Sequence, residues 1–174
     1  MGKFGIKQIV GHIANNPLLE PNRYEVIING PVAIDTAKAK AISFSCSEAA
    51  IPGHNIGTFE HSIAGPKRKI PNEELFDDLS LTFYNGHHMW EIGFIDDWMR
   101  LIAGESNFRM SYYNDIVADI NILIYDLREN KVADVRLTEA YPIGMADVPL
   151  SYDADGPSKL SVNFTYHTYT IERF

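Results

Sequence analysis

The chain has only one cysteine in its 174 residues. Cys46 therefore cannot form an internal disulfide, which excludes the disulfide frameworks of small secreted domains. No Cys-x-x-Cys pair accompanies the six histidines, so the sequence contains no structural zinc pattern. We expect a chain that folds in a reducing compartment and depends on its hydrophobic core.

No long apolar run is present. The N-terminal sequence MGKFGIKQIVGHIANN is interrupted by Gln8 and His12, so it is too short and too polar for a signal peptide or a membrane span. Position 6 is isoleucine, whereas the myristoylation pattern requires serine or threonine there. We expect a soluble protein with no membrane partner.

Basic residues are scarce. The 15 lysines and arginines face 23 aspartates and glutamates, which gives a net charge of −8. A protein that holds nucleic acid needs a basic face, and only the GPKRK sequence at 65–69 is locally basic. Short charged runs of this kind are usually exposed loops. An acidic surface could instead repel a strand that must pass without sticking.

The signatures of common enzymes are also missing. There is no G-x-S-x-G elbow, no glycine-rich loop before a lysine, and no cysteine with an obvious histidine partner. We therefore predict a protein that is not an enzyme and has no catalytic, cofactor-binding or metal-binding residues. An active site assembled from distant residues would leave no such signature, and nothing in the sequence points to one.

Polar and apolar residues alternate with a period of two along much of the chain, as in half-buried β-strands. In residues 42–46, for example, Ile42, Phe44 and Cys46 alternate with serines, which predicts a strand with a buried thiol. A single, mainly β domain over 1–174 is the expectation. The other strands are predicted at residues 24–28, 79–84, 116–125, 135–137 and 160–166.

One segment follows the helical period instead. Apolar residues at spacings of three and four predict an amphipathic helix over 88–103, with Phe94, Trp98 and Ile102 as its core anchors. The adjacent His87 and His88 would diverge by about 100° on a helix, so they cannot easily share one metal ion. The adjacent aspartates of this helix have the same defect, which favours a solvated polar face.

Two segments are predicted to reach outside the core. Residues 55–70 have strand-like residues on both sides of an AGPKRK tip, which predicts an extended hairpin. Residues 1–17 form an N-terminal arm with apolar residues partly at helical spacing, ended by NNPLLEPN. We interpret both as segments that dock on another surface.

The order of the segments resembles the tail tube proteins of contractile-tailed bacteriophages. Each block is loose alone, but together they occur in the family's order across about residues 17 to 171. The matching blocks are EPNRYEVII at 20–28, CSEAAIPG at 46–53, LFDDLSLTFYN at 75–85, FIDDWMRLIAG at 94–104, YPIGMADVPLSYD at 141–153 and LSVNFTYHTY at 160–169.

The resemblance implies a β-sandwich or partly closed β-barrel with one packed α-helix, assembled into hexameric rings that stack into a hollow tube for double-stranded DNA. In such a tube Asp119 and Asn121, on the polar side of the predicted strand 116–125, would face the lumen. The candidate subunit contacts are Phe4, Ile9, Phe59, His61, Lys67 and Arg68. The implied partners are further copies of the chain and sheath, baseplate and tape-measure proteins, in the virion tail and, during assembly, in the host cytoplasm.

Three other functions stay open at this stage. The same family includes baseplate proteins that initiate the tube and tube proteins of secretion and contractile injection devices. A monomeric β-barrel that binds a small ligand is the alternative from a different class of protein.

Overall fold

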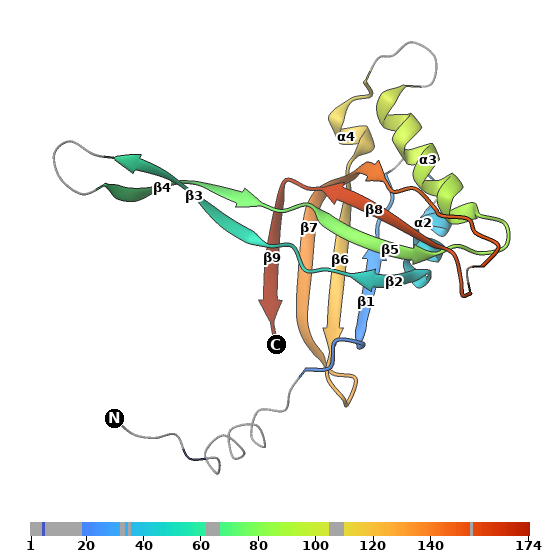
Figure 1. Ribbon diagram of the computed structural model, residues 1–174, viewed down its shortest axis with the longest axis horizontal. Helices are drawn as coiled ribbons and strands as arrows, with labels where there is room; N and C mark the ends of the chain where they lie inside the picture. The colour runs from blue at the N-terminus through green and yellow to red at the C-terminus, as the bar shows by residue number, and fades with distance from the viewer. Residues whose placement is uncertain are drawn as a thin grey trace.

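The computed structural model describes residues 5, 19–31, 34, 36–61, 67–104, 110–153 and 155–174. The predicted N-terminal arm, apart from Gly5, lies outside this described part. The fold is mainly β, as predicted (Figure 1). Its elements are β1 (Tyr24–Ile28), α2 (Thr36–Phe44), β2 (Cys46–Ala49), β3 (His54–His61), β4 (Arg68–Phe76), β5 (Leu79–Tyr84), α3 (Trp90–Ala103), α4 (Tyr113–Ile116), β6 (Ala118–Tyr125), β7 (Lys131–Met145), β8 (Lys159–Thr165) and β9 (Thr168–Arg173).

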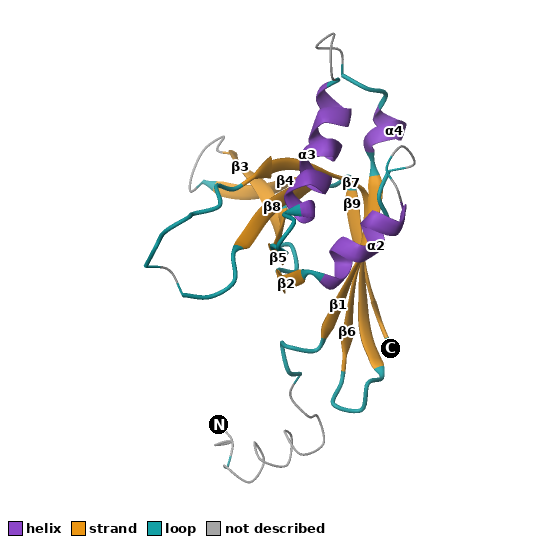
Figure 2. Ribbon diagram, turned by 90° about the vertical axis from the view of Figure 1, so that its right-hand side faces the viewer, coloured by secondary structure: helices purple, strands orange, loops and turns teal. Residues whose placement is uncertain are grey.

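The main sheet folds into two layers that share one long strand. The first layer has the order β1-β6-β7-β9 and the second β7-β8-β5-β2, with every neighbouring pair antiparallel. Figure 2 shows the two layers separating, with the helices near the open side between them. The sheet does not close, which confirms the prediction of a sandwich-like or partly closed barrel.

A backbone irregularity in β7 lets this strand serve both layers. Residues up to Ala140 pair with β6, whereas residues from Tyr141 pair with β8. At the junction Glu139 has a φ of 54°, and the register against β6 shifts by one residue. A bulge of this kind increases the local bend of a strand. The bulge at Glu139 is therefore where β7 leaves one layer and enters the other.

The core lies between the two layers and is closed by α3. The inward residues of β5, Leu79, Leu81 and Phe83, are fully buried, as alternation predicted. The structure also buries Phe94 and Trp98 in this core, while Ile102 is half-buried against it. The helix itself begins at Trp90, two residues later than predicted.

The predicted strand at 42–46 is wrong. Residues 36–44 form the helix α2, and only Cys46 belongs to a strand. Alanine and lysine favour helix in this stretch. On a helix, residues two apart point about 200° apart, so Ile42 is fully buried while Phe44 is 85% exposed. With α2 and α4, the fold has more than the one helix that was predicted.

Two strand boundaries also differ from prediction. The run from 160 onward is divided, because Tyr166 and His167 lie between β8 and β9, and these strands pair with different parts of β7. Ile116 ends α4 instead of opening a strand, since β6 begins at Ala118. The first boundary occurs where the chain passes from the second layer to the first, and the second where it passes from a helix to a strand.

Candidate assembly surfaces

The first layer has one face toward the core and one face away from it, which we call the outer face. Residues directly opposite each other in a ladder share a face. The register therefore places Glu25, Leu123, Asp134 and Glu172 in one row across the four strands. The adjacent row contains Asn121 opposite Arg136.

Acidic groups dominate this outer face. Its exposed acids are Glu25, Asp119 and Glu172, and Asp134 lies on the same face but is buried. Its described bases are Lys131 and Arg136. The Lys131 ammonium donates to the Asp134 carboxylate over 2.8 Å. The Tyr125 hydroxyl donates to Glu25 over 3.0 Å, and burial, more than this bond, raises the pKa of the tyrosine. The face presents a net negative charge.

The structure places both candidate lumen residues on the outer face. Asp119 is exposed and Asn121 is half-buried. The Asp119 carboxylate also accepts a hydrogen bond of 3.3 Å from the N–H of Glu139. It therefore holds the β7 bulge as well as contributing charge.

The first layer ends in a free strand on each side within the described part of the chain. On β1, the Ser43 hydroxyl of α2 accepts the Ile28 N–H over 3.0 Å, so that group points away from β6. Alternation in an antiparallel ladder then directs the backbone groups of Tyr24 and Val26 outward as well. On β9, Phe174 donates to Val132 of β7 over 3.0 Å. By the same alternation Ile171 points outward.

The two free strands run in opposite directions. Three successive antiparallel pairings separate β1 from β9, so β1 is antiparallel to β9 (Figure 1). A free strand with unpaired N–H and C=O groups is a template for pairing with another chain. No local sequence pattern identified these edges, because edge position depends on the whole topology.

The hairpin predicted at 55–70 is longer in the structure. β3 and β4 pair with each other from His54–Phe76 to His61–Arg68 and extend away from the body beyond β9 (Figure 1). Every described residue of the hairpin is exposed except Gly57 and Phe76, which are half-buried. An isolated two-stranded hairpin is at best marginally stable in water. The hairpin therefore presents two exposed faces on which another copy or another protein can pack.

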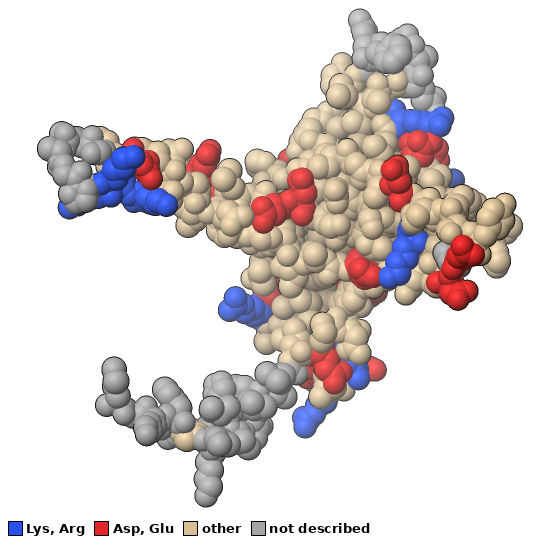
Figure 3. All heavy atoms as spheres, in the orientation of Figure 1, with Lys and Arg blue, Asp and Glu red and all other residues tan. Residues whose placement is uncertain are grey.

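The hairpin brings together four of the six candidate contact residues. Phe59 is 46% exposed and lies opposite Ile70, while the exposed His61 lies opposite Arg68. Lys67 forms an exposed ion pair of 3.1 Å with Glu60. Figure 3 shows lysine and arginine side chains gathered toward the end of the hairpin. The other two candidates, Phe4 and Ile9, lie outside the described residues.

The base of the hairpin is fastened to the body. Asn55 donates its amide group to both carboxylate oxygens of Asp77 over 3.1 Å. A Cβ at Gly53 would collide with the same carboxylate, so a larger residue there would displace the Asp77 side chain from Asn55. The Tyr166 hydroxyl donates to the Asp77 carbonyl over 2.8 Å, and its pKa is raised to about 12, chiefly by burial. These contacts set the direction of the hairpin.

An aromatic cluster completes this fastening. Phe76 lies between His54, at 5.3 Å between ring centroids, and Tyr169 of β9, at 5.5 Å. Aromatic pairs in such tilted or edge-on arrangements stabilise beyond their buried area. None of these residues was singled out from the sequence, because His54 and Tyr169 are more than a hundred positions apart.

Chemical groups typical of active sites are not gathered on these surfaces. Within the described ranges, no cluster of three His, Cys, Asp or Glu residues could hold a metal ion. His87 and His88 are exposed in the turn before α3. Burial raises the pKa of the Cys46 thiol to about 11, which makes it less reactive. None of the described helices is long and apolar enough to cross a membrane.

Comparison with known proteins identifies one family. A family model described as phage tail tube protein matches residues 19–172. No curated protein matches the chain in sequence.

Solved structures of contractile injection devices share the fold. A chain of the PVC sheath–tube complex, an extracellular contractile injection system in its extended state, aligns with a TM-score of 0.65 and 12% identity over 94% of this chain and 97% of that chain. A chain of the anti-feeding prophage baseplate aligns with a TM-score of 0.63 and 12% identity over 91% and 97%. A chain of the anti-feeding prophage cap aligns with a TM-score of 0.64 and 12% identity over 90% and 92%.

Proposed function

Because the chain belongs to the phage tail tube protein family, we propose that its copies form hexameric rings that stack into a hollow tube for double-stranded DNA. The observation that carries this proposal is the first sheet layer. It has a free strand on each side, an apolar face toward the core and an acidic outer face. A layer of this kind can be continued by a second copy on either side.

Ring closure joins the two different edges. β9 of one copy pairs with β1 of the next, and this pairing is antiparallel because the two strands run in opposite directions within each copy. Such a head-to-tail contact uses two different surfaces and closes into a ring when the rotation per copy is right. Closure also removes the exposed edges, which is how barrels avoid uncontrolled association.

A ring of six copies is wide enough for DNA. Six copies with four strands each give about 24 strands, which at about 4.8 Å spacing close a barrel about 37 Å across, before strand tilt widens it. Side chains occupy about 5 Å of each wall, since stacked sheets lie about 10 Å apart. About 27 Å remains, which clears a DNA duplex about 20 Å across. Five copies would leave only about 21 Å by the same geometry.

The outer face of the sheet forms the lumen in this proposal. Asp119 and Asn121 lie on it beside Glu25, Asp134 and Glu172. Negative charges repel the phosphates of passing DNA, and the repulsion extends over a Debye length of about 8 Å at physiological salt. A wall that repels DNA at short range lets it slide without binding.

The remaining surfaces make contacts outside the ring wall. Phe59, His61, Lys67 and Arg68 of the hairpin contact a neighbouring copy, as do Phe4 and Ile9 of the N-terminal arm. Because similar chains come from a sheath–tube complex and a baseplate, we include sheath and baseplate proteins among the partners. A tape-measure protein occupies the tube during assembly in the host cytoplasm. The chain has no catalytic role in this function.

A tube of a contractile injection device is the second candidate. The similarity to the chain of an extracellular contractile injection system favours it, because that structure shares the fold over nearly the whole chain. Such a tube has the same wall but another cargo. A baseplate tube initiator is a third version of the same subunit, and it would form isolated rings instead of long tubes.

Electron microscopy and light scattering of the purified chain test the proposal. Rings of constant diameter, or long tubes built from them, are expected, and class averages should have six-fold symmetry. Monomers over a wide concentration range would contradict the proposal and favour a monomeric ligand-binding barrel. Virions imaged during ejection should contain DNA inside the tube. The tube of an injection device would contain another cargo.

A further inference from the structure

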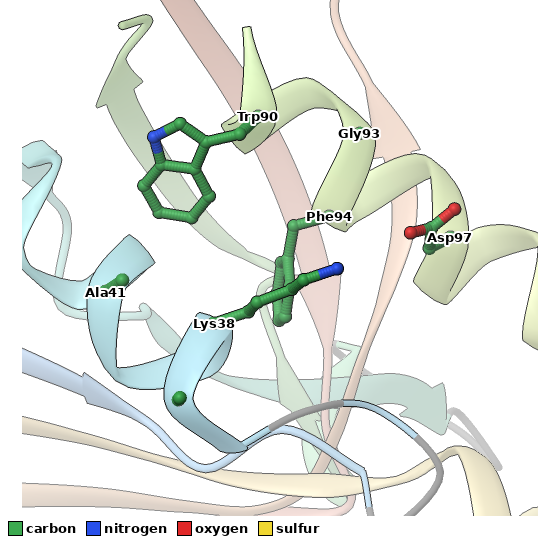
Figure 4. Close-up of a pocket in the computed structure, with 7 residues that line it drawn as sticks. Lys38, Ala41, Trp90, Gly93, Phe94 and Asp97 are labelled. Carbon is green, nitrogen blue, oxygen red and sulfur yellow. The ribbon is translucent and has the colours of Figure 1, made fainter. Parts of the chain in front are cut away.

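A groove of about 500 Å³ lies between α2 and α3 (Figure 4). Trp90 and Phe94 point from α3 toward α2 and give the groove an apolar floor, to which Ala41 of α2 contributes. Lys38 extends past Phe94 in the direction of Asp97, so a base and an acid lie at the rim. The groove is therefore apolar inside and charged with both signs at its edge.

Within a single copy, nothing in the structure requires a glycine at position 93 in this groove. It lies in the interior of α3, where glycine destabilises a helix relative to alanine. It is exposed, and a Cβ added to it would meet nothing within 4 Å. Glycine is the usual residue where another backbone approaches closely. Its position in the groove points to a segment that lies against it in the assembly.

The hairpin has the matching shape and chemistry. One of its faces carries the apolar pair Phe59 and Ile70, with Arg68 toward the tip and Glu73 toward the base. Gly57 lies directly opposite Glu73, whose side chain occupies the space that a Cβ at position 57 would take. This face is therefore an apolar pair flanked by a base and an acid, which is the complement of the groove.

The two surfaces lie on opposite sides of the molecule. The hairpin extends past β9, whereas α2 lies beside β1, to which the Ser43–Ile28 hydrogen bond ties it (Figure 1). In Figure 2 the viewer faces the α2 side, and the hairpin lies behind the body. When β9 of one copy meets β1 of the next, the hairpin is therefore carried toward the α2 side of that neighbour.

We propose that the β3–β4 hairpin of each copy lies in the α2–α3 groove of the adjacent copy in the ring. The Phe59–Ile70 pair covers Trp90, and the hairpin backbone approaches Gly93. Arg68 pairs with Asp97, and Glu73 pairs with Lys38. The contact rests on the proposed ring, and it explains what covers one face of a hairpin that is exposed on both faces in the single copy.

Cross-linking between cysteine pairs tests the placement directly. His61→Cys, on the same hairpin face as Phe59, and Ala41→Cys, in the groove, are introduced into a Cys46→Ala chain, separately and together, and treated with a short bis-maleimide. The chain with both cysteines should give at least about tenfold more linked copies than either single variant, because the contact raises the effective concentration of the two thiols. His61→Cys with Ala103→Cys, at the far end of α3, is the control and should show no such gain.

Charge reversal gives a second measurement that does not depend on labelling. Arg68→Glu and Asp97→Arg should each weaken ring formation about tenfold or more in concentration, since each places like charges together. The double variant should recover most of the loss. Both residues are exposed in the free chain, so circular dichroism and the melting temperature of the monomer should stay unchanged.

The outcomes separate this contact from the ring itself. Rings without the His61–Ala41 link, or charge reversals whose effects simply add, would overturn the hairpin contact and leave the proposed function standing. Rings in which Ala41→Cys stays open to a bulky maleimide would show that the groove is uncovered in the ring and would also overturn the contact. A chain that forms neither rings nor links would contradict both proposals.

Discussion

Trp98 connects α3 to both the second layer and the segment before β6. Its ring packs edge-on against Phe94 at 6.0 Å and Phe164 of β8 at 5.9 Å. Its buried indole N–H donates to the Ile116 carbonyl over 2.8 Å. One side chain therefore provides apolar contact and satisfies a buried backbone acceptor.

Trp98→Ala is expected to lower the free energy of unfolding by about 3 to 5 kcal/mol, because it leaves a cavity and removes that hydrogen bond. Urea denaturation of the monomer measures the change. The control His88→Ala, in the exposed turn before the helix, should cost less than about 0.5 kcal/mol. A loss below about 1 kcal/mol for Trp98→Ala would show that the core collapses around the gap.

Glu139 has a left-handed backbone conformation that side chains disfavour. Replacement by glycine should therefore give a more stable chain than replacement by alanine, by about 1 kcal/mol. Both variants lose the 3.0 Å hydrogen bond from the Tyr113 hydroxyl, so their difference reports the backbone alone. Thermal denaturation of the two variants is the measurement. Alanine as stable as glycine would mean that the bulge can relax.

The Cys46 thiol is expected to react slowly. With a pKa of about 11, about one thiol in a thousand is ionised at pH 8. Alkylation should therefore be about a hundredfold slower than in the unfolded chain. The rate should keep rising up to about pH 11. Because the folded pKa lies above the unfolded one, the associated stabilisation is present below about pH 9 and is lost as the pH rises through about 11. A rate that levels off near pH 9 would contradict the burial of this thiol.

At the scale of elements, sequence patterns predicted strands correctly where one face of the strand meets the core. β5 and β6 alternate between buried and polar residues because each lies between the core and water. The same period-two pattern failed at Ile42 and Phe44, where a short helix that buries few residues gives only a weak helical pattern. The division of β8 from β9 was missed because both halves keep the same alternation while they pair with different parts of β7.

The assembly surfaces were less predictable than the core. The exposed hairpin followed from local turn chemistry, and Asp119 and Asn121 followed from alternation. The free edges of β1 and β9 depend on which strands pair, and the α2–α3 groove depends on a helix that alternation had assigned as a strand. Asn55 and Asp77 meet only because the chain returns to the hairpin base.

Ile171→Pro tests the β9 edge. Proline removes the outward N–H that would pair with β1 of the next copy, while edge strands tolerate proline within one chain. Ile171→Ala is the matched control, because it shortens the same side chain but keeps the N–H. The two monomers should differ in stability by no more than about 1 kcal/mol, yet only the proline variant should fail to form rings in light scattering. Normal tubes from Ile171→Pro would exclude β9 from ring closure.

At the scale of the whole molecule, the two faces of the first layer have separate tasks. The inner face is apolar and is covered by the second layer and α3, so it makes each copy stable. The outer face carries charge and contributes little to the core, so it is free to be adapted to what the tube conducts. This separation predicts that the charge of the outer face can be reversed without loss of assembly.

Thr170→Lys with Glu172→Lys performs that reversal. Both positions are exposed and lie on the outer face opposite Arg136 and Asp134. Tubes of this variant should form with unchanged diameter but retain duplex DNA at about 50 mM salt and release it at about 200 mM, because binding through phosphates weakens steeply with salt. Asp153→Lys, in the exposed loop after β7, adds positive charge elsewhere and should leave DNA retention at the level of the unmodified tube. Retention that does not depend on the position of the added charge would place the outer face of the sheet away from the DNA path.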